Sequence, residues 1–204
     1  MSLGSASLYL VARARLGAGT LADLVPELVS AGVDIVQLRE KEMDKAEVRE
    51  AAAPILDACR SAGIPFIVND YPDVAAELGA DGVHVGQDDA PVPAARRAAG
   101  GLVGLSTHSR QQVIAAEPVA PDYIAVGPVY ETPTKPGRSS VGLELLSFAA
   151  QHAAVPWFAI GGIDLTNVAE VVAAGARRIV VVRAITEALD PMAAAAALKA
   201  QLPG

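Results

Sequence analysis

The sequence has a single cysteine and no long apolar run. With one cysteine in 204 residues, the chain has no partner for an intramolecular disulfide or a thiolate metal site, and Cys59 is predicted to be a small buried hydrophobic residue. No apolar run approaches the roughly 20 residues of a membrane span. The start, MSLGSAS, lacks the charged and then apolar stretches of a secretory signal. We therefore expect a cytoplasmic protein with no membrane partner.

An excess of positive charge is also absent. Lysine and arginine number 16 against 23 acidic residues, which gives a formal net charge of -7 and a pI near 4.9. Because a nucleic-acid or anionic membrane surface needs excess basic residues, the charge argues against these partners, and small molecules remain. The number of subunits is not fixed by the sequence, and a homo-oligomer is compatible with it.

Short apolar runs rich in β-branched residues alternate with alanine-rich helical patterns. The runs cover residues 8–13, 34–40, 65–70, 82–87, 102–107, 122–128, 156–162 and 178–184. Eight strand-helix units favour a closed (β/α)8 TIM barrel of α/β class over an open doubly wound sheet, because closure leaves no edge strand. We expect a single barrel domain over residues 7–204, preceded by six residues that are disordered or left from expression.

Polar residues gather where the predicted strands end, and active sites of (β/α)8 barrels lie at that face. In the run QLREK, Gln37, Arg39 and Lys41 point the same way by strand alternation. Two cations on one inward face suit an anion such as pyrophosphate between them. The alternative is a strand end whose charges are only exposed to solvent. Lys41 and Lys135 could also be Schiff-base lysines, but that would leave the nearby aspartates without a role.

Carboxylates follow two neighbouring predicted strands. Asp70 ends one strand, and Asp88 and Asp89 follow the next. Carboxylates that converge from adjacent strand ends suit Mg²⁺, which takes oxygen ligands and keeps water and phosphate in its shell. The alternative is capping of the following helix, which for Asp88, together with simple solvation, is the preferred interpretation.

A second anion site is expected after the last two strands, which often bind phosphate in this architecture. Gly161 and Gly162 follow one strand, and Arg183 interrupts an apolar run near the end of the next. A tight turn and a surface charge are the alternatives. Between the two sites, the loop with Thr132 and Thr134 offers hydroxyl donors to a phosphate. Lys135 in that loop could reach either anion.

The histidines carry no firm signal. His108 ends a predicted strand and is equally well interpreted as a proton shuttle or as a hydrogen-bonded wall of the site. His84 within a strand and His152 on a helix are expected to take no part in the chemistry.

These motifs, taken in order, resemble a known family. VQLREK, VND, DGVHVGQDDA, GLSTHS, VGPVYETPTKPGR, AIGGI and VVVRAI look like the signature of thiamine-phosphate synthases, also called thiamine-phosphate pyrophosphorylases. The match covers nearly the whole barrel. The resemblance implies a transferase that joins 4-amino-2-methyl-5-pyrimidinylmethyl diphosphate to 4-methyl-5-(2-phosphooxyethyl)thiazole and releases pyrophosphate. It further implies a dissociative reaction with one Mg²⁺ ion per site.

The resemblance also implies roles for particular residues. The pyrimidine diphosphate would be held by Gln37, Arg39, Lys41, Asn69, Ser106 and Lys135, of which Arg39, Lys41, Ser106 and Lys135 would be catalytic. The thiazole phosphate would be held by Thr132, Pro133, Thr134, Gly162, Val182 and Arg183. Asp70 and Asp89 would bind Mg²⁺. Val141 stands where many family members have glutamine, so no contact is expected there.

Two other functions remain open from the sequence. A thiazole tautomerase of the same barrel family would use the histidine of STHS as its acid-base group, but it would have no diphosphate for the QLREK and GQDD motifs to hold. A non-catalytic protein that sequesters thiamine precursors would bind both ligands without turnover.

Overall fold

The computed structural model describes residues 3–17, 19–131 and 139–203. Their parallel strands close into one barrel with the order β1-β10-β9-β8-β7-β6-β5-β4. The strands are β1 Leu8–Ala12, β4 Ile35–Leu38, β5 Phe66–Asn69, β6 Gly82–Val85, β7 Leu102–Thr107, β8 Tyr123–Val126, β9 Trp157–Ile160 and β10 Ile179–Val181. The predicted (β/α)8 barrel is confirmed, and the open sheet is excluded because β1 pairs with both β10 and β4.

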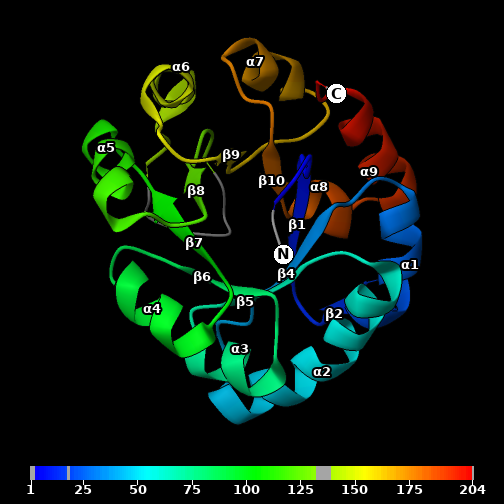
Figure 1. Ribbon diagram of the computed structural model, residues 1–204. Helices are drawn as coiled ribbons and strands as arrows, with labels where there is room; N and C mark the ends of the chain where they lie inside the picture. The colour runs from blue at the N-terminus through cyan, green and yellow to red at the C-terminus, as the bar shows by residue number, and fades with distance from the viewer. Residues whose placement is uncertain (1–2, 18, 132–138, 204) are drawn as a thin grey trace.

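Helices surround the strands. They are α1 Leu21–Ser30, α2 Lys45–Ala62, α3 Pro72–Leu78, α4 Val92–Ala99, α5 Arg110–Val119, α6 Gly142–His152, α7 Val168–Ala173, α8 Arg183–Thr186 and α9 Pro191–Ala200. The view along the barrel in Figure 1 shows most of them as an outer ring, whereas the short α8 lies close to β10. An antiparallel hairpin of β2 Arg15–Leu16 and β3 Gly19–Thr20 follows β1. Within the described ranges, no helix is long and apolar enough to cross a membrane.

Local sequence signals explain the ends of the longest helix, α2. Asp44 accepts hydrogen bonds from the N–H groups of Ala46 and Glu47, and the Glu47 carboxylate accepts from the Asp44 N–H, which completes a capping box. At the other end Gly63 adopts φ 74°, a left-handed conformation that glycine tolerates best. Loss of the Asp44 cap would destabilise the protein by about 1 kcal/mol.

Strand alternation divides the buried residues into two sets. Residues on the outer face of the strands, such as Leu10 and Val36, pack under the helices. A smaller apolar cluster fills the barrel interior and consists of Tyr9, Val11, Ile35, Ile67, Leu102, Tyr123, Phe158 and Val180. Because side chains alternate along a strand, the residue two positions beyond Ile35 also points inward. That residue is Gln37, so the same alternation that fills the interior carries polar groups to the mouth.

The opposite, N-terminal end of the barrel is closed by a repeated hydrogen bond. Asp34, Asp81 and Asp122 precede β4, β6 and β8. Each carboxylate accepts an N–H from the start of the neighbouring strand: Leu8 at 2.8 Å, Phe66 at 2.9 Å and Val103 at 2.7 Å. Backbone groups at the floor are thereby satisfied, as buried polar groups must be.

Candidate active site

A cavity of about 1200 Å³ opens at the C-terminal ends of the barrel strands. Every predicted site residue that the structure describes lines it: Gln37, Arg39, Lys41, Asn69, Asp70, Asp89, Ser106, Gly162, Val182 and Arg183. The predicted contacts of Thr132, Pro133, Thr134 and Lys135 lie outside the described residues. The volume exceeds that of many single-ligand pockets, which are about 300 to 1,000 Å³, so two small substrates can share it.

The end of β4 places its polar residues at three depths. Gln37 is buried and donates from Nε2 to the Tyr9 hydroxyl at 2.5 Å. Arg39 lies nearer the mouth, where its backbone N–H donates to the Ala12 carbonyl at 2.9 Å. Lys41 is half-exposed and forms an ion pair with Asp70. These side chains line one cavity, which favours a shared site over a strand end whose charges are only exposed to solvent.

Arg39 lies in an environment that is unfavourable for its charge. Burial lowers the pKa of its guanidinium, and nearby Arg13 lowers it further, whereas the Asp70 carboxylate raises it. A second anion in the cavity would stabilise both arginines. Arg13 and Arg15 also line the cavity. Neither arginine was predicted as a site residue, although both follow the first strand, which ends at the same face.

Asp70 combines backbone strain with an unfavourable charge. Its φ is 67°, a left-handed value that few non-glycine residues adopt. Burial raises the pKa of its carboxyl, as does the adjacent Asp89, and the ion pair with Lys41 offsets this only in part. Strain of this kind clusters at functional sites.

The two aspartates after β6 do not cap the next helix. The N-cap of α4 is Pro91, with no side-chain cap hydrogen bond. Asp89 instead turns back and accepts the Gly86 N–H at 2.7 Å, so the capping alternative for Asp89 is wrong. Its carboxylate lies so close to Gly86 that a Cβ there would be 2.9 Å from Oδ2. Asp88 is exposed, in line with solvation.

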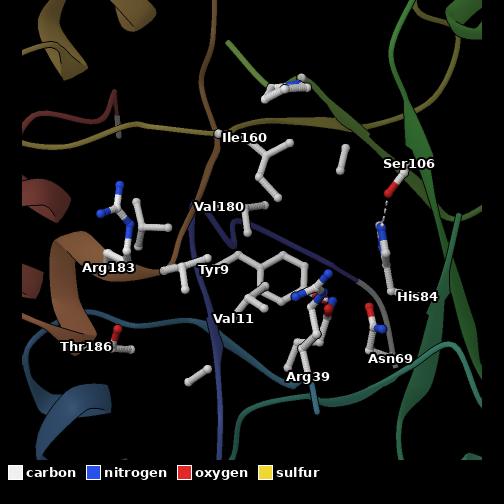
Figure 2. Close-up of a pocket in the computed structure, with 18 of the residues that line it drawn as sticks. Tyr9, Val11, Arg39, Asn69, His84, Ser106, Ile160, Val180, Arg183 and Thr186 are labelled. Carbon is white, nitrogen blue, oxygen red and sulfur yellow. Dashed lines mark hydrogen bonds between the residues drawn. The ribbon is translucent and has the colours of Figure 1, made fainter. Parts of the chain in front are cut away.

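Ser106 is held at the end of β7 by two neighbours. The Gln87 amide donates to its carbonyl at 2.6 Å, and His84 Nε2 lies 3.0 Å from its hydroxyl. Figure 2 shows the hydrogen bond between His84 and Ser106 on one side of the pocket, with Asn69 nearby. The backbone and the side chain of Ser106 are therefore each positioned separately.

His108 is anchored to the wall of the cavity. Its Nδ1 lies 2.5 Å from the Gly127 carbonyl oxygen. Because a carbonyl only accepts hydrogen bonds, the Nδ1 nitrogen must carry a proton in this contact. The backbone N–H of His108 also donates to Gln112 at 2.7 Å. These contacts favour the interpretation of His108 as a hydrogen-bonded wall.

The opposite side of the cavity is built by β9, β10 and α8. Gly161 and Gly162 have φ values of 104° and 69°, and a Cβ on Gly162 would lie 2.7 Å from the Cβ of Tyr130. Glycine is thus required by both conformation and space. Val182 precedes the first turn of α8, and Arg183 begins it. Figure 2 shows Arg183 across the pocket from Ser106 and His84.

The cations and carboxylates thus surround one open mouth at the C-terminal face of a (β/α)8 barrel, the face at which enzymes of this architecture have their active sites. A family described as "Thiamine monophosphate synthase" matches residues 8–185. The chain belongs to this thiamine-phosphate synthase family, and it is accordingly an enzyme of the transferase class.

The relatives are similar over almost their full lengths. A thiamine-phosphate synthase from Thermus thermophilus is 48% identical over 200 residues, 97% of each chain. One from Mycobacterium marinum is 51% identical over 212 residues, 98% of this chain and 96% of the relative. A solved thiamine phosphate pyrophosphorylase from Pyrococcus furiosus has a TM-score of 0.87 at 30% identity and covers 97% of this chain and 95% of its own.

Proposed function

We propose that this cavity joins 4-amino-2-methyl-5-pyrimidinylmethyl diphosphate to 4-methyl-5-(2-phosphooxyethyl)thiazole and releases pyrophosphate. The observation that carries the proposal is the separation of two polar regions in one cavity. Arg39 and Lys41 follow β4 and Ser106 lies near the end of β7, whereas Gly162 follows β9 and Arg183 follows β10. Figure 2 shows Arg183 across the pocket from Ser106. A reaction between a diphosphate and a phosphate ester requires two such regions at once, with the reacting atoms between them.

The first region would hold the diphosphate. Arg39 offers a bidentate guanidinium and Lys41 an ammonium, and both suit phosphate oxygens. Ser106 adds a hydroxyl donor. Negative charge grows on the departing oxygens as the bond breaks, so these donors would stabilise the transition state more than the ground state. Lys135 is proposed to complete this set.

Asp70 and Asp89 are proposed to hold one Mg²⁺ ion. The residues fit, because burial and the adjacent Asp89 carboxylate raise the pKa of Asp70 and a shared cation would relieve this repulsion. In the part of the chain that the structure describes, no three His, Cys, Asp or Glu residues form a metal cluster. Two carboxylates would leave room for water and phosphate oxygens, which Mg²⁺ commonly retains. The ion would neutralise charge on the leaving group.

The second region would hold the thiazole phosphate. Gly162 presents backbone without a side chain, and the chain turns into α8 at Val182 and Arg183. Free N–H groups at such a turn suit a phosphate. The side chain of Arg183 lies 3.9 Å from Glu187 and can supply further positive charge. Thr132, Pro133 and Thr134 are proposed to close this site.

The proposed substitution is dissociative. Pyrophosphate would leave first, and the resulting pyrimidine-methylene cation would be captured by the thiazole nitrogen. The chain contributes apolar walls around the reacting atoms, including Val11, Ile160 and Val180, which limit attack by water. No covalent nucleophile is needed, and the single cysteine, Cys59, is fully buried in α2.

The decisive experiment is incubation of the protein with both substrates, with and without Mg²⁺, and detection of thiamine phosphate by mass. We expect product only when both substrates and Mg²⁺ are present. Reactions that omit one substrate, and a matched Asp89→Asn variant, serve as controls. Tight binding of both ligands without turnover would overturn the proposal in favour of a sequestering protein. Isomerisation of a thiazole carboxylate phosphate would point to a tautomerase instead.

A further inference from the structure

A chain of hydrogen bonds runs through the barrel interior and ends at Ser106. Gln37 Nε2 donates to the Tyr9 hydroxyl at 2.5 Å, and that hydroxyl lies 2.8 Å from the Tyr123 hydroxyl. The Tyr123 hydroxyl lies 3.2 Å from His84 Nδ1. His84 Nε2 lies 3.0 Å from Ser106 Oγ. We call these five side chains the interior chain; it connects β4, β1, β8, β6 and β7.

The barrel is built around the interior chain. Tyr9 and Tyr123 are 1% and 0% exposed, and both pack edge-on against Phe158 with ring centroids 5.5 Å apart. Gly104 on β7 has no side chain, and a Cβ there would overlap the Tyr123 phenol and the His84 ring. The absence of a Gly104 side chain thus makes room for the contact between Tyr123 and His84. Tight packing fixes the chain in one arrangement.

The donors and acceptors of the interior chain indicate that hydrogen bonds are donated in one direction, from Gln37 towards Ser106. The Gln37 amide nitrogen only donates, so the Tyr9 oxygen accepts, and the buried Tyr9 hydroxyl then has the Tyr123 oxygen as the other partner to which it can donate its own hydrogen. Burial raises the pKa of both phenols, which keeps one hydrogen on each. Tyr123 then donates to His84 Nδ1. With Nδ1 as the acceptor, a neutral ring carries its hydrogen on Nε2 and donates it to Ser106.

We propose that His84 is a positioning residue whose Nε2–H fixes Ser106 Oγ and directs the Ser106 hydroxyl hydrogen into the cavity. A serine oxygen that accepts one hydrogen bond still has its own hydrogen to donate. Ser106 lines the cavity, so that hydrogen is available to an oxygen of the leaving group. Donation by His84 also polarises the Ser106 hydroxyl and makes it a stronger donor. The inference rests on the proposed function, which places the diphosphate at Ser106.

The hydrogen bonds of His84 go beyond packing, whereas the sequence alone predicted no part for this residue in the chemistry. A histidine that only fills the core would end on a backbone or core group. His84 instead joins a buried phenol to a hydroxyl at the cavity surface. Its carbonyl oxygen also accepts the Asp70 N–H at 2.8 Å, so the same residue supports the strained turn at Asp70.

The test is a double-mutant cycle between Tyr123→Phe and Ser106→Ala. Tyr123→Phe keeps the ring but removes the donor to Nδ1, which frees the imidazole to move its hydrogen away from Ser106. We expect kcat and kcat/KM for the pyrimidine diphosphate to fall together by about three- to tenfold, as for an interaction made in the transition state. In the Ser106→Ala background, Tyr123→Phe should have no further effect, because the hydroxyl it orients is gone.

Matched phenylalanine variants sharpen the test. Tyr9→Phe lies one step further from His84 and leaves the Tyr123 donor in place, so its effect should be smaller than that of Tyr123→Phe. Tyr130→Phe removes a phenol that donates to Glu170 at 3.4 Å, outside the interior chain, and should leave turnover unchanged. Additive losses in the Ser106→Ala background would overturn the proposal, since a merely structural effect persists without the hydroxyl.

Nitrogen-15 NMR of the wild-type histidine rings tests the inference should Tyr123→Phe fail to fold. We expect a ring hydrogen on Nε2 and none on Nδ1, because Nδ1 accepts from Tyr123. The His84 signal is assigned by its loss in His84→Gln. A hydrogen on Nδ1 would overturn the proposal. The same assays separate the two levels of inference. A wild-type protein that forms no thiamine phosphate refutes the proposed function, whereas normal turnover with the wrong tautomer refutes only the role of His84.

Discussion

Aspartates at the two ends of the barrel are held in opposite ways. At the floor, burial works to raise the pKa of Asp34, but the Leu8 N–H, the Lys199 ammonium and the Ser7 N–H outweigh it and lower the pKa. At the mouth, burial raises the pKa of Asp70, Asp89 adds to the rise, and the pairing with Lys41 does not cancel it. The surroundings of Asp34 therefore stabilise a charged carboxylate, whereas the surroundings of Asp70 do not fully compensate the negative charge of its carboxylate.

This difference separates stability from function. The floor aspartates complete the hydrogen bonds of neighbouring strands, so their charge and geometry serve the fold. Asp70 has a strained φ of 67° and shares its surroundings with a second carboxylate, an arrangement that a bound cation would improve. In (β/α)8 barrels the C-terminal face carries the chemistry and the N-terminal face the stability, and the hydrogen bonds here give that division a physical basis.

The largest expected effect at the mouth is that of Arg39→Ala. The variant removes a partly buried guanidinium from the cavity, and turnover should fall ten- to a hundredfold, about 1.4 to 2.7 kcal/mol in the barrier. Steady-state kinetics with both substrates measure it. Arg97→Ala on the exposed face of α4 is the matched control and should retain wild-type turnover. Equal rates in Arg39→Ala and wild type under saturating Mg²⁺ would contradict the site assignment.

Asp89→Asn tests whether the mouth depends on charge. The amide oxygen can still accept the Gly86 N–H, but one negative charge is lost, so turnover should fall at least tenfold and more Mg²⁺ should be needed for half-maximal rate. The unfolding midpoint should change little. An Mg²⁺ titration of the rate measures the effect. An unchanged Mg²⁺ dependence would argue that Asp89 does not bind the ion.

Asp34→Ala is the corresponding change at the floor. It removes the acceptor of two backbone N–H groups and one of the two acceptors of the Lys199 ammonium, which keeps Ser7 Oγ. The loss should cost about 2 kcal/mol of unfolding free energy. Thermal unfolding should shift down by roughly 4 to 8 °C, while turnover per folded molecule stays near wild type. A loss of turnover in Asp34→Ala at unchanged stability would contradict the assignment of stability to the floor of the barrel and of function to its mouth.

The pH dependence of the stability of Asp34→Ala tests whether the lost stability comes from the charge of the Asp34 carboxylate. The folded pKa of Asp34 is lowered, so its stabilisation is fully present above the unfolded pKa of about 3.9 and is lost as the pH falls through the lower folded pKa. Urea midpoints of wild type and Asp34→Ala should therefore differ fully at neutral pH and converge in acid. A difference that stays constant below the unfolded pKa would exclude this linkage.

The smallest expected effect is that of Asp81→Asn. The asparagine oxygen can replace the carboxylate as acceptor for the Phe66 N–H, so unfolding free energy should change by less than about 1 kcal/mol and turnover should not change. Urea unfolding and the turnover assay measure the two quantities. Set beside Asp89→Asn, the same substitution should be tolerated at the floor and damaging at the mouth. A large stability loss would mean that the floor also depends on charge.

Strand alternation made part of the site predictable. The spacing of Gln37, Arg39 and Lys41 placed them on one face, and the structure brings them to one cavity. The alternation of Tyr9 and Val11 carried the same information but was not used, because both residues look like ordinary core. The hydrogen-bond partner of Asp89 could not be predicted. The same sequence allows its carboxylate to accept the N–H of the preceding Gly86 or to cap the helix that follows.

By itself, the order of apolar runs and helical segments determined the closed barrel, because eight parallel strands leave no edge only when they close. The residues that follow each strand were thereby assigned to one face. Only the tertiary structure decided which of them touch. The interior chain joins residues from five strands, and contacts across a barrel depend on register and packing between distant segments, which no local pattern encodes.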